Sequence, residues 1–364
     1  MTLWRYILRG FLRAVLGVFL VIALVIVLFT SVENMRRFDG SGAGATDVIQ
    51  VTLLQAPEVL YQVFPLALML ASLLTFLRFA RNSELVVMRA AGVSALRLIS
   101  VPVIAAMVLG MIFVAVVNPF VAASIKRGEA LANDFTNQGS SLLSFSAEGV
   151  WLRQADPEGQ TVIQAARTNA DGTILTRVRM HRFNKEGTLY ARIDAPAARL
   201  TPGAWLLEDA TEWQLAEDGG FDRTFTGGRM NLPSTLTSAE ILESFAPPEE
   251  VGFWDLGRFI NQMEESGFSG QRHRLYLQSE LAKPALFAAM VLIGSAFALR
   301  PTRFGQTGIM ILLAVMAGFA LYFLKDFAES LGGRGQIPLM VAAWAPPIAA
   351  ILLATSLLLH LEDG

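Results

Sequence analysis

The sequence has no cysteine and little charge. Without cysteine among its 364 residues, disulfides, thiolate zinc sites and cysteine nucleophiles are excluded. Charged residues make up 16% of the chain and hydrophobic residues 53%, whereas soluble proteins carry about 25% charged residues. A net charge of −2 gives no indication of nucleic-acid binding. The balance of charged and apolar residues indicates a membrane protein.

The sequence patterns of common catalytic sites are also missing. There is no GxxxxGK[ST] loop for ATP and no GxSxG nucleophile elbow. The three histidines, His181, His273 and His360, lack the HExxH spacing of a metal site. We therefore expect a chain that is not an enzyme and that holds no metal or cofactor.

Six apolar runs are long enough to cross a bilayer, for which about 20 residues suffice. They span Leu12–Val32, Pro57–Phe79, Leu96–Phe120, Leu275–Leu299, Gly308–Phe327 and Ile337–Leu359. The fourth run is imperfect, because Glu280, Lys283 and Pro284 lie within its first turns. The sequence thus predicts a bundle of six transmembrane helices with a large insert between the third and the fourth.

Arginines are distributed unevenly between the two sides of these runs. One side holds Arg5, Arg9, Arg13, Arg78, Arg81, Arg89, Arg97, Arg300 and Arg303, and the short loops of the other side hold Arg36, Arg37 and Arg334. Because cytoplasmic loops are enriched in Lys and Arg, we expect both termini in the cytoplasm and the large insert outside.

The insert, residues 121–252, changes to short alternating segments separated by Gly and Asp. In TILTRVRMHRF, Ile174, Val178 and Met180 alternate with polar residues, as in a half-buried strand. Several such runs predict an all-β domain of the sandwich or jelly-roll kind. Residues 253–273 form an amphipathic connecting helix, expected either at the membrane surface or against the β domain. The helical regions are then residues 1–120 and 274–364.

A short helix is predicted between the second and third runs, in NSELVVMRAAG. Asn82 or Ser83 can cap its start and Gly92 can close its end. A helix of barely two turns is marginal by itself in water. It must therefore rest on something else.

Two surfaces are candidates for that support. In a helix-in-groove contact with another protein, Leu85, Val86 and Met88 are the anchors, Glu84 pairs with an arginine, and Arg89 pairs with an acid. Alternatively, the helix lies on lipid. The residues alone leave both open.

Charged residues near the outer ends of two runs are further candidates. Lys325 and Asp326, with Glu329 one turn on, either line a polar cavity or mark an early end of the fifth run. Arg36 and Arg37 either pair with phosphate groups of a lipid, which suit the guanidinium fork, or anchor the first run at the interface.

RFARNSELVVMRAAGVSALRL resembles the signature of the LptF/LptG permeases of the lipopolysaccharide transport exporter. The resemblance extends over nearly the whole chain, through PEVLYQVFPLALMLASLLTFLRFA, GSSLLSFSAEGVWLR and RLYLQSELAKPALFAAMVLIGSAFAL. It includes the order of three spans, outer β domain and three spans. The form NSELVVM is closer to the LptG branch than to the LptF branch.

The resemblance implies a non-catalytic permease subunit of an ABC exporter in the bacterial inner membrane. Its partners would be an LptF-like permease, an LptB-like ATPase dimer that hydrolyses ATP, and an LptC-like periplasmic bridge protein. The subunit would extract lipopolysaccharide and pass it through a periplasmic β-jellyroll to the bridge. The alternatives are the LptF role in the same complex, or an adaptor that relays motion and moves no lipid.

The resemblance also implies roles for residues. The helix 83–91 would be the coupling helix, with Glu84 as its acidic contact to the ATPase. The first and fifth spans would form gates and cavity, which places Thr30 and Phe323 at the lipid. Their outer ends, with Arg36, Arg37, Lys325 and Asp326, would lie near the head group. Thr30 stands where some members have a lysine, so phosphate recognition would fall on the two arginines or on the partner permease.

Overall fold

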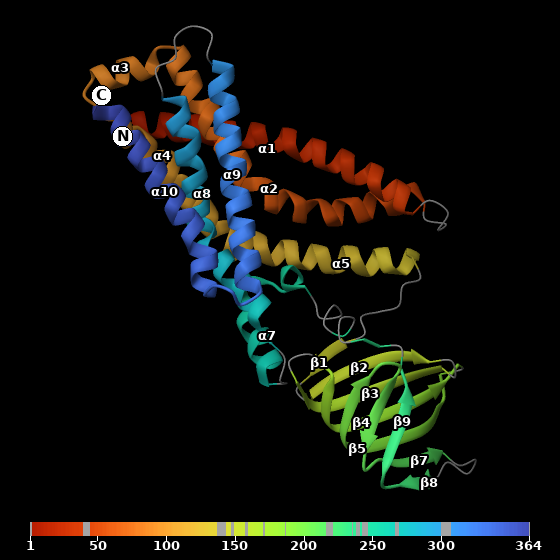
Figure 1. Cartoon of the computed structure of the whole chain (residues 1–364). Helices are drawn as coiled ribbons and strands as arrows, with labels where there is room; N and C mark the ends of the chain where they lie inside the picture. The colour runs from red at the N-terminus through yellow and green to blue at the C-terminus, as the bar shows by residue number, and fades with distance from the viewer. Residues whose placement is uncertain are drawn as a thin grey trace. The chain divides into compact units, whose positions relative to one another are not determined.

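Two compact units make up the chain. The computed structural model describes residues 2–38, 44–136, 143–146, 149–156, 159–169, 172–185, 187–215, 221–234, 236–237, 241, 247–265, 269–299 and 307–363. The helical unit contains Met1–Asn137, Glu249–Trp254 and His273–Gly364, and the β unit contains Gln138–Pro248 and Asp255–Arg272. Figure 1 shows both units.

The helical unit confirms the predicted bundle. Its elements are α1 (Thr2–Arg37), α2 (Ala45–Arg81), α3 (Glu84–Ala90), α4 (Ala95–Ile112), the π-helix η1 (Phe113–Val117), α5 (Asn118–Thr136), the 3₁₀ turn η2 (Pro248–Glu250), α8 (Gln271–Ala298), α9 (Thr307–Gly333) and α10 (Leu339–Asp363). Within the described residues, six helices are long and apolar enough to span a membrane, counting α4, η1 and α5 as one.

The third span runs on further than the predicted end at Phe120, since α5 continues to Thr136. The β unit accordingly starts later than residue 121.

The extended third span includes an irregular turn. Pro119 has no N–H to donate to the carbonyl of Ala115, four residues earlier, and the indole Nε1 of Trp254 donates to that oxygen instead, at 2.9 Å. This contact holds the returning segment Glu249–Trp254 on the third span.

Small residues bring α2 and α8 close together. A Cβ on Gly294 would lie 2.4 Å from the carbonyl oxygen of Met69, so only glycine fits at this crossing. Nearby, the Ser72 hydroxyl donates to the carbonyl of Val291 at 2.9 Å and shares a hydrogen bond with Ser295. Close packing of small residues with interhelical hydrogen bonds is the usual basis of helix association in membranes.

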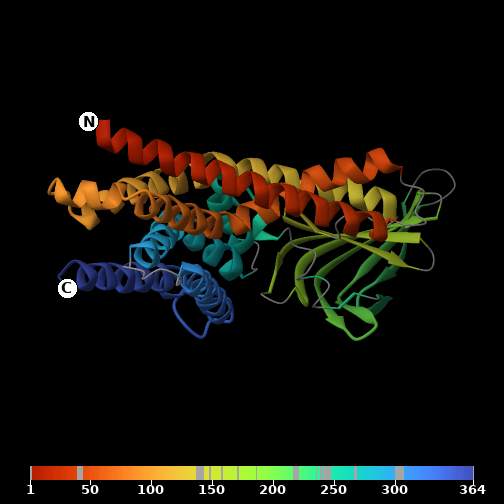
Figure 2. The same ribbon diagram turned by 90° about the horizontal axis from the view of Figure 1, so that it is seen from above.

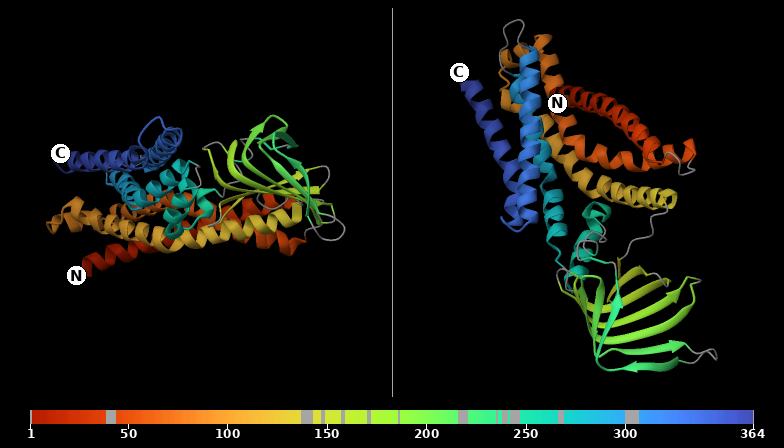
Figure 3. Two further views of the ribbon diagram at one scale, coloured as in Figure 1. Left: turned by 90° about the horizontal axis from the view of Figure 1, so that it is seen from below. Right: turned by 45° about the vertical axis from the view of Figure 1, so that its right-hand side comes forward.

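The spans differ in how much of their apolar surface the chain covers. In its most apolar stretch, α2 is 67% buried and α8 72%, whereas α1 is 6% buried and α9 17%. Figure 2 shows α1 running beside α2 at the edge of the helical unit, and Figure 3 shows that α1 and α9 diverge. Four of the six spans are less than half buried, and α1 and α9 leave the most apolar surface to lipid or to another protein.

The β unit is one antiparallel sheet. Its strands are β1 (Leu143–Ser146), β2 (Gly149–Asp156), β3 (Gly159–Thr168), β4 (Ile174–Asn184), β5 (Leu189–Thr201), β6 (Ala204–Glu208), β7 (Thr211–Leu215), β8 (Phe221–Thr226) and β9 (Arg229–Pro233). Strands β1 to β6 pair in sequence order and β9 pairs with β6, while the β7–β8 hairpin joins the other half of β5. The inserted all-β domain is thus confirmed.

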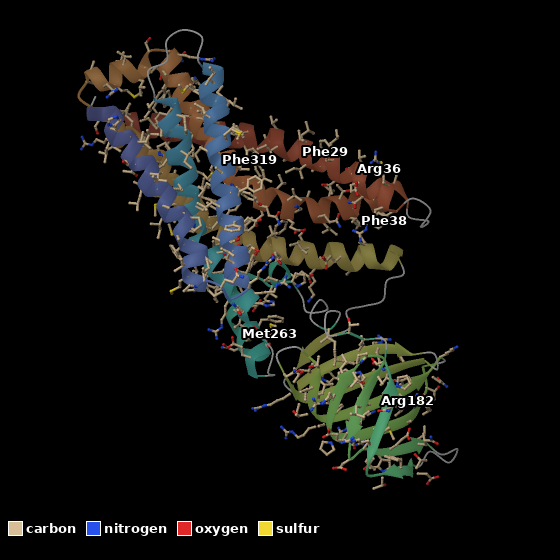
Figure 4. The ribbon with its side chains drawn as sticks, in the orientation of Figure 1. Phe29, Arg36, Phe38, Arg182, Met263 and Phe319 are labelled. Atoms are coloured by element: carbon tan, nitrogen blue, oxygen red, sulfur yellow. The ribbon has the colours of Figure 1, made fainter. Side chains whose placement is uncertain are left out.

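The sheet curls around its apolar core. The buried amide of Gln154 on β2 accepts from the indole of Trp205 on β6 at 3.2 Å and from Ser234, after β9, at 2.8 Å. Strands that are distant in the sheet order thus meet across the interior. Helix α7 (Phe253–Glu265) adds Met263 to the same core, and Figure 4 labels this residue. This helix was predicted to lie either at the membrane surface or against the β domain, and in the structure it packs on the β core.

Strand β4 departs from the simple alternation that the sequence suggests. Val178 and Met180 are buried as expected, but the buried residue before them is Leu175, and Ile174 is only half-buried. Arg177, between them, has a left-handed φ of 51°. That local twist turns successive side chains and shifts the buried face by one residue.

Candidate functional site

The short helix α3 rests on its own chain. Leu85 and Met88 are 9% and 8% exposed and belong to the core of the helical unit, so they are not free to serve as anchors in a partner's groove, which was one of the two predicted arrangements. The outward apolar residues are Val86 and Val87, 66% and 68% exposed. The three-residue spacing of Leu85 and Met88 marked the face correctly, but that face points inward.

The start of α3 is not capped in the expected way. Ser83 stands at the cap position with a left-handed φ of 58° and no side-chain cap hydrogen bond. Instead, the Asn82 amide donates to Oε1 of Glu84 at 3.2 Å, and the Tyr6 hydroxyl donates to Oε2 at 2.8 Å. The carboxylate of Glu84, the predicted acidic contact, is thus held at a defined position. Arg89 is exposed on the last turn of the same helix.

The C-terminal end of α1 presents two arginines to the surroundings. Asn34 is buried, and its amide donates to Thr52 at 3.1 Å and to Gln55 at 2.9 Å on α2. This contact fixes the rotation of α1, so that Arg36 and Arg37 are exposed; Figure 4 labels Arg36. Thr30, one and a half turns earlier, is half-buried.

Helix α9 separates its charged residues. The Lys325 ammonium lies 2.7 Å from Oε2 of Glu329, and the Ser279 hydroxyl on α8 donates to the other oxygen of that carboxylate at 2.6 Å. Asp326 is exposed, and Phe323 is 68% exposed. Lys325 therefore faces the bundle and Asp326 does not.

A second polar cluster, which was not predicted from the sequence, lies between α2 and α8. Glu280 is 1% exposed, and its carboxylate accepts from Tyr61 and lies 2.6 Å from the ammonium of Lys283. Lys283 also lies 3.6 Å from the centre of the Tyr61 ring. The signal was present in the sequence, because a Glu and a Lys three residues apart share one helix face.

The predicted lipid contacts lie on two separate helices. Thr30, Arg36 and Arg37 are on α1, and Phe323, Lys325 and Asp326 are on α9, which diverges from it (Figure 3). Both helices carry exposed aromatic residues, among them Phe29 and Phe319, labelled in Figure 4. The chain thus offers two half-surfaces, each apolar with charge toward its C-terminal end.

Glutamates gather beside the returning segment. Glu250 of η2 lies against Glu129 of α5, with Glu249, Glu58 and Lys126 close by. Burial, together with a hydrogen bond and repulsion from Glu129, raises the pKa of Glu250 to about 8, while Lys126 opposes the shift. This carboxyl group is thus protonated in the folded chain at neutral pH.

We expect the stability of the helical unit to fall as the pH rises from about 4.5 to about 8. The folded chain keeps the Glu250 proton through this range and the unfolded chain loses it, so the stabilisation is complete below the unfolded pKa and is lost toward the folded one. Glu250→Gln mimics the protonated form. Its thermal midpoint should exceed that of the wild type by more at about pH 9 than at about pH 5. Glu208→Gln, on an exposed strand position, is the control, and equal gains at both pH values would refute the assignment.

Metal-binding chemistry is absent from the described part of the chain, where no three His, Asp or Glu residues are arranged to hold an ion. The expectation of a chain without a metal stays a prediction.

Together these features define a class: a polytopic helical membrane protein with an inserted antiparallel β unit and a short surface helix between two spans. The model of the family "Lipopolysaccharide export system permease LptF/LptG" matches residues 5–360, and the chain belongs to this family. The chain is similar to the lipopolysaccharide export system permease protein LptG of Escherichia coli K12, at 24% identity over 94% of this chain and 96% of the relative. It is also similar to the LptG protein of Haemophilus influenzae, at 23% identity over 100% and 99%. The resemblance drawn from the sequence is thus confirmed at the family level.

Proposed function

We propose that the chain is the LptG-type permease subunit of an ABC exporter in the bacterial inner membrane. It extracts lipopolysaccharide from that membrane together with an LptF-like permease and delivers it to an LptC-like periplasmic bridge. The observation that carries the proposal is the uncovered apolar surface of α1 and α9, 6% and 17% buried, with arginines at the end of α1. Such a surface suits a ligand that has both acyl chains and phosphates.

The head-group contacts follow from where the cations lie. Arg36 and Arg37 are exposed at the end of α1 and offer the planar donor fork that phosphate prefers. Lys325 is paired with Glu329 within the chain. We therefore expect the lipid phosphates to contact the two arginines first and Lys325 afterwards. Because α1 and α9 diverge, the partner permease supplies the surface that closes each half-site.

The energy comes from another chain, since this sequence has no Walker motif. The docking surface for an LptB-like ATPase is the outer face of α3, with Val86 and Val87 as apolar contacts and Glu84 and Arg89 as charged ones. The arginines around α3 favour a cytoplasmic position. Both termini are then cytoplasmic and the β unit is periplasmic.

Photo-crosslinking tests where the lipid lies. A photoreactive residue at Phe323 or Thr30 should capture lipopolysaccharide in membranes that contain the assembled complex. Leu353 on α10, which is 72% exposed, is the matched control position and should capture much less. Capture at none of the three positions, or equally at all of them, would favour the adaptor that moves no lipid.

A further inference from the structure

A hydrogen bond joins α3 to the first span. The Tyr6 hydroxyl donates to Oε2 of Glu84 at 2.8 Å, and the Asn82 amide donates to Oε1 at 3.2 Å. The two donors have different origins, because Asn82 belongs to the same loop as α3 whereas Tyr6 belongs to α1. Of the two donors, the tyrosine is the one that links Glu84 to another span.

Tyr6 is held in place by its neighbours. Its ring stacks on Phe79 near the end of α2, with centroids 5.8 Å apart and planes at 25°. On the next position, Ile7 is fully buried in the core that also contains Leu85 and Met88. The first turns of α1 are thus seated on the corner between α2 and α3.

The middle of α1 is less buried than its ends. Ile7, Phe11 and Val15 are buried near the start and Asn34 near the end, but no side chain from 16 to 33 is buried. The helix has 36 residues, which is about 54 Å at 1.5 Å per residue. A shift of its first turns would tilt this less buried middle of α1 about the contact that Asn34 makes with α2.

Helix α3 lies between two residues with left-handed backbone conformations. A left-handed residue lies at each end, Ser83 with φ 58° and Gly92 with φ 81°, so the backbone turns sharply on both sides of a rigid seven-residue segment. A push on its exposed face would rotate it between these two corners. Glu84, on its first turn, would carry Tyr6 along.

We infer that Tyr6 is a positioning residue that passes movement of α3 directly to the first span, in parallel with the covalent route through α2 and α4. The inference rests on the proposed docking of an ATPase on α3. It adds a specific route by which that docking reaches α1, the least buried span.

The test measures movement of α1 in the assembled complex. Leu24, in the less buried middle of α1, is 70% exposed. Because the chain has no cysteine, Leu24→Cys gives this chain a single thiol. Its maleimide labelling rate is compared with and without ATP plus vanadate, in the otherwise native chain, with Tyr6→Phe, and with Asn82→Ala. Tyr6→Phe removes the hydroxyl and keeps the ring on Phe79.

We expect ATP plus vanadate to change the labelling rate at Leu24→Cys, and Tyr6→Phe to lose a measurable part of that change, because only the covalent route through α2 and α4 then remains. The amount of co-purified ATPase should stay the same, and Asn82→Ala should keep most of the response. An unchanged response in Tyr6→Phe, an equal loss in Asn82→Ala, or no response in the native background overturns the inference. If no ATPase co-purifies with the native chain, the proposed function itself fails.

Discussion

Glu84→Lys should abolish stable association with the ATPase or uncouple ATP hydrolysis from lipid transport. The substitution places a positive charge where Tyr6 and Asn82 now hold a carboxylate on the surface of α3. Reversing a charge in a buried interface costs roughly 2–5 kcal/mol. We therefore expect the yield of co-purified ATPase to fall by an order of magnitude or more.

Two variants separate the possible causes of that loss. Glu84→Gln removes the charge without reversing it and should give an intermediate yield. Glu208→Lys makes the same charge change on an exposed position of β6 and should leave the yield unaltered. A Glu84→Lys chain with full complex yield and full transport would remove the docking role of α3.

Lys283→Met should destabilise the helical unit strongly. It leaves the carboxylate of Glu280, which is 1% exposed, with the Tyr61 hydroxyl but without its cation. Breaking a buried ion pair from one side costs about 3–5 kcal/mol, because one charge stays buried and uncompensated. Thermal unfolding of the purified chain in detergent should show a markedly lower midpoint.

The double variant Glu280→Gln with Lys283→Met removes both charges and should recover most of the lost stability. Lys325→Met breaks a pair whose side chains are about one-fifth exposed, at 22% and 19%, and should cost less than Lys283→Met. If the single and double variants unfold at the same temperature, the uncompensated charge of Glu280 is not the cause of the lost stability.

Much of the architecture was predictable because it follows from the length of the apolar runs and from the period at which apolar residues recur. Six long apolar runs indicate spans in a bilayer, and period-two runs between Gly and Asp turns indicate paired strands. The predictions differed from the structure where polar residues continue a helix, as in α5, which runs on to Thr136. Composition alone does not show where a helix leaves the bilayer.

The candidate site was predictable in position but less so in orientation. NSELVVMRAAG was correctly read as a helix with an apolar face, but periodicity does not distinguish a face packed on its own chain from one offered to a partner. Leu85 and Met88 proved to be the former. The contact between Tyr6 and Glu84 joins residues far apart in sequence, so only the fold reveals it.

A single thiol on the outer face of α3 tests whether a separate ATPase drives this bundle through that face. In this cysteine-free chain, Val86→Cys, at a position 66% exposed, is compared with Val116→Cys on the third span, where the side chain is 64% exposed. A reagent that is thiol-reactive at one end and photoreactive at the other, applied to membranes that hold the assembled complex, should join Val86→Cys to the ATPase and leave Val116→Cys without such an adduct. If Val86→Cys forms an adduct with no other protein, or if both positions form the same adducts, the ATPase does not dock on α3.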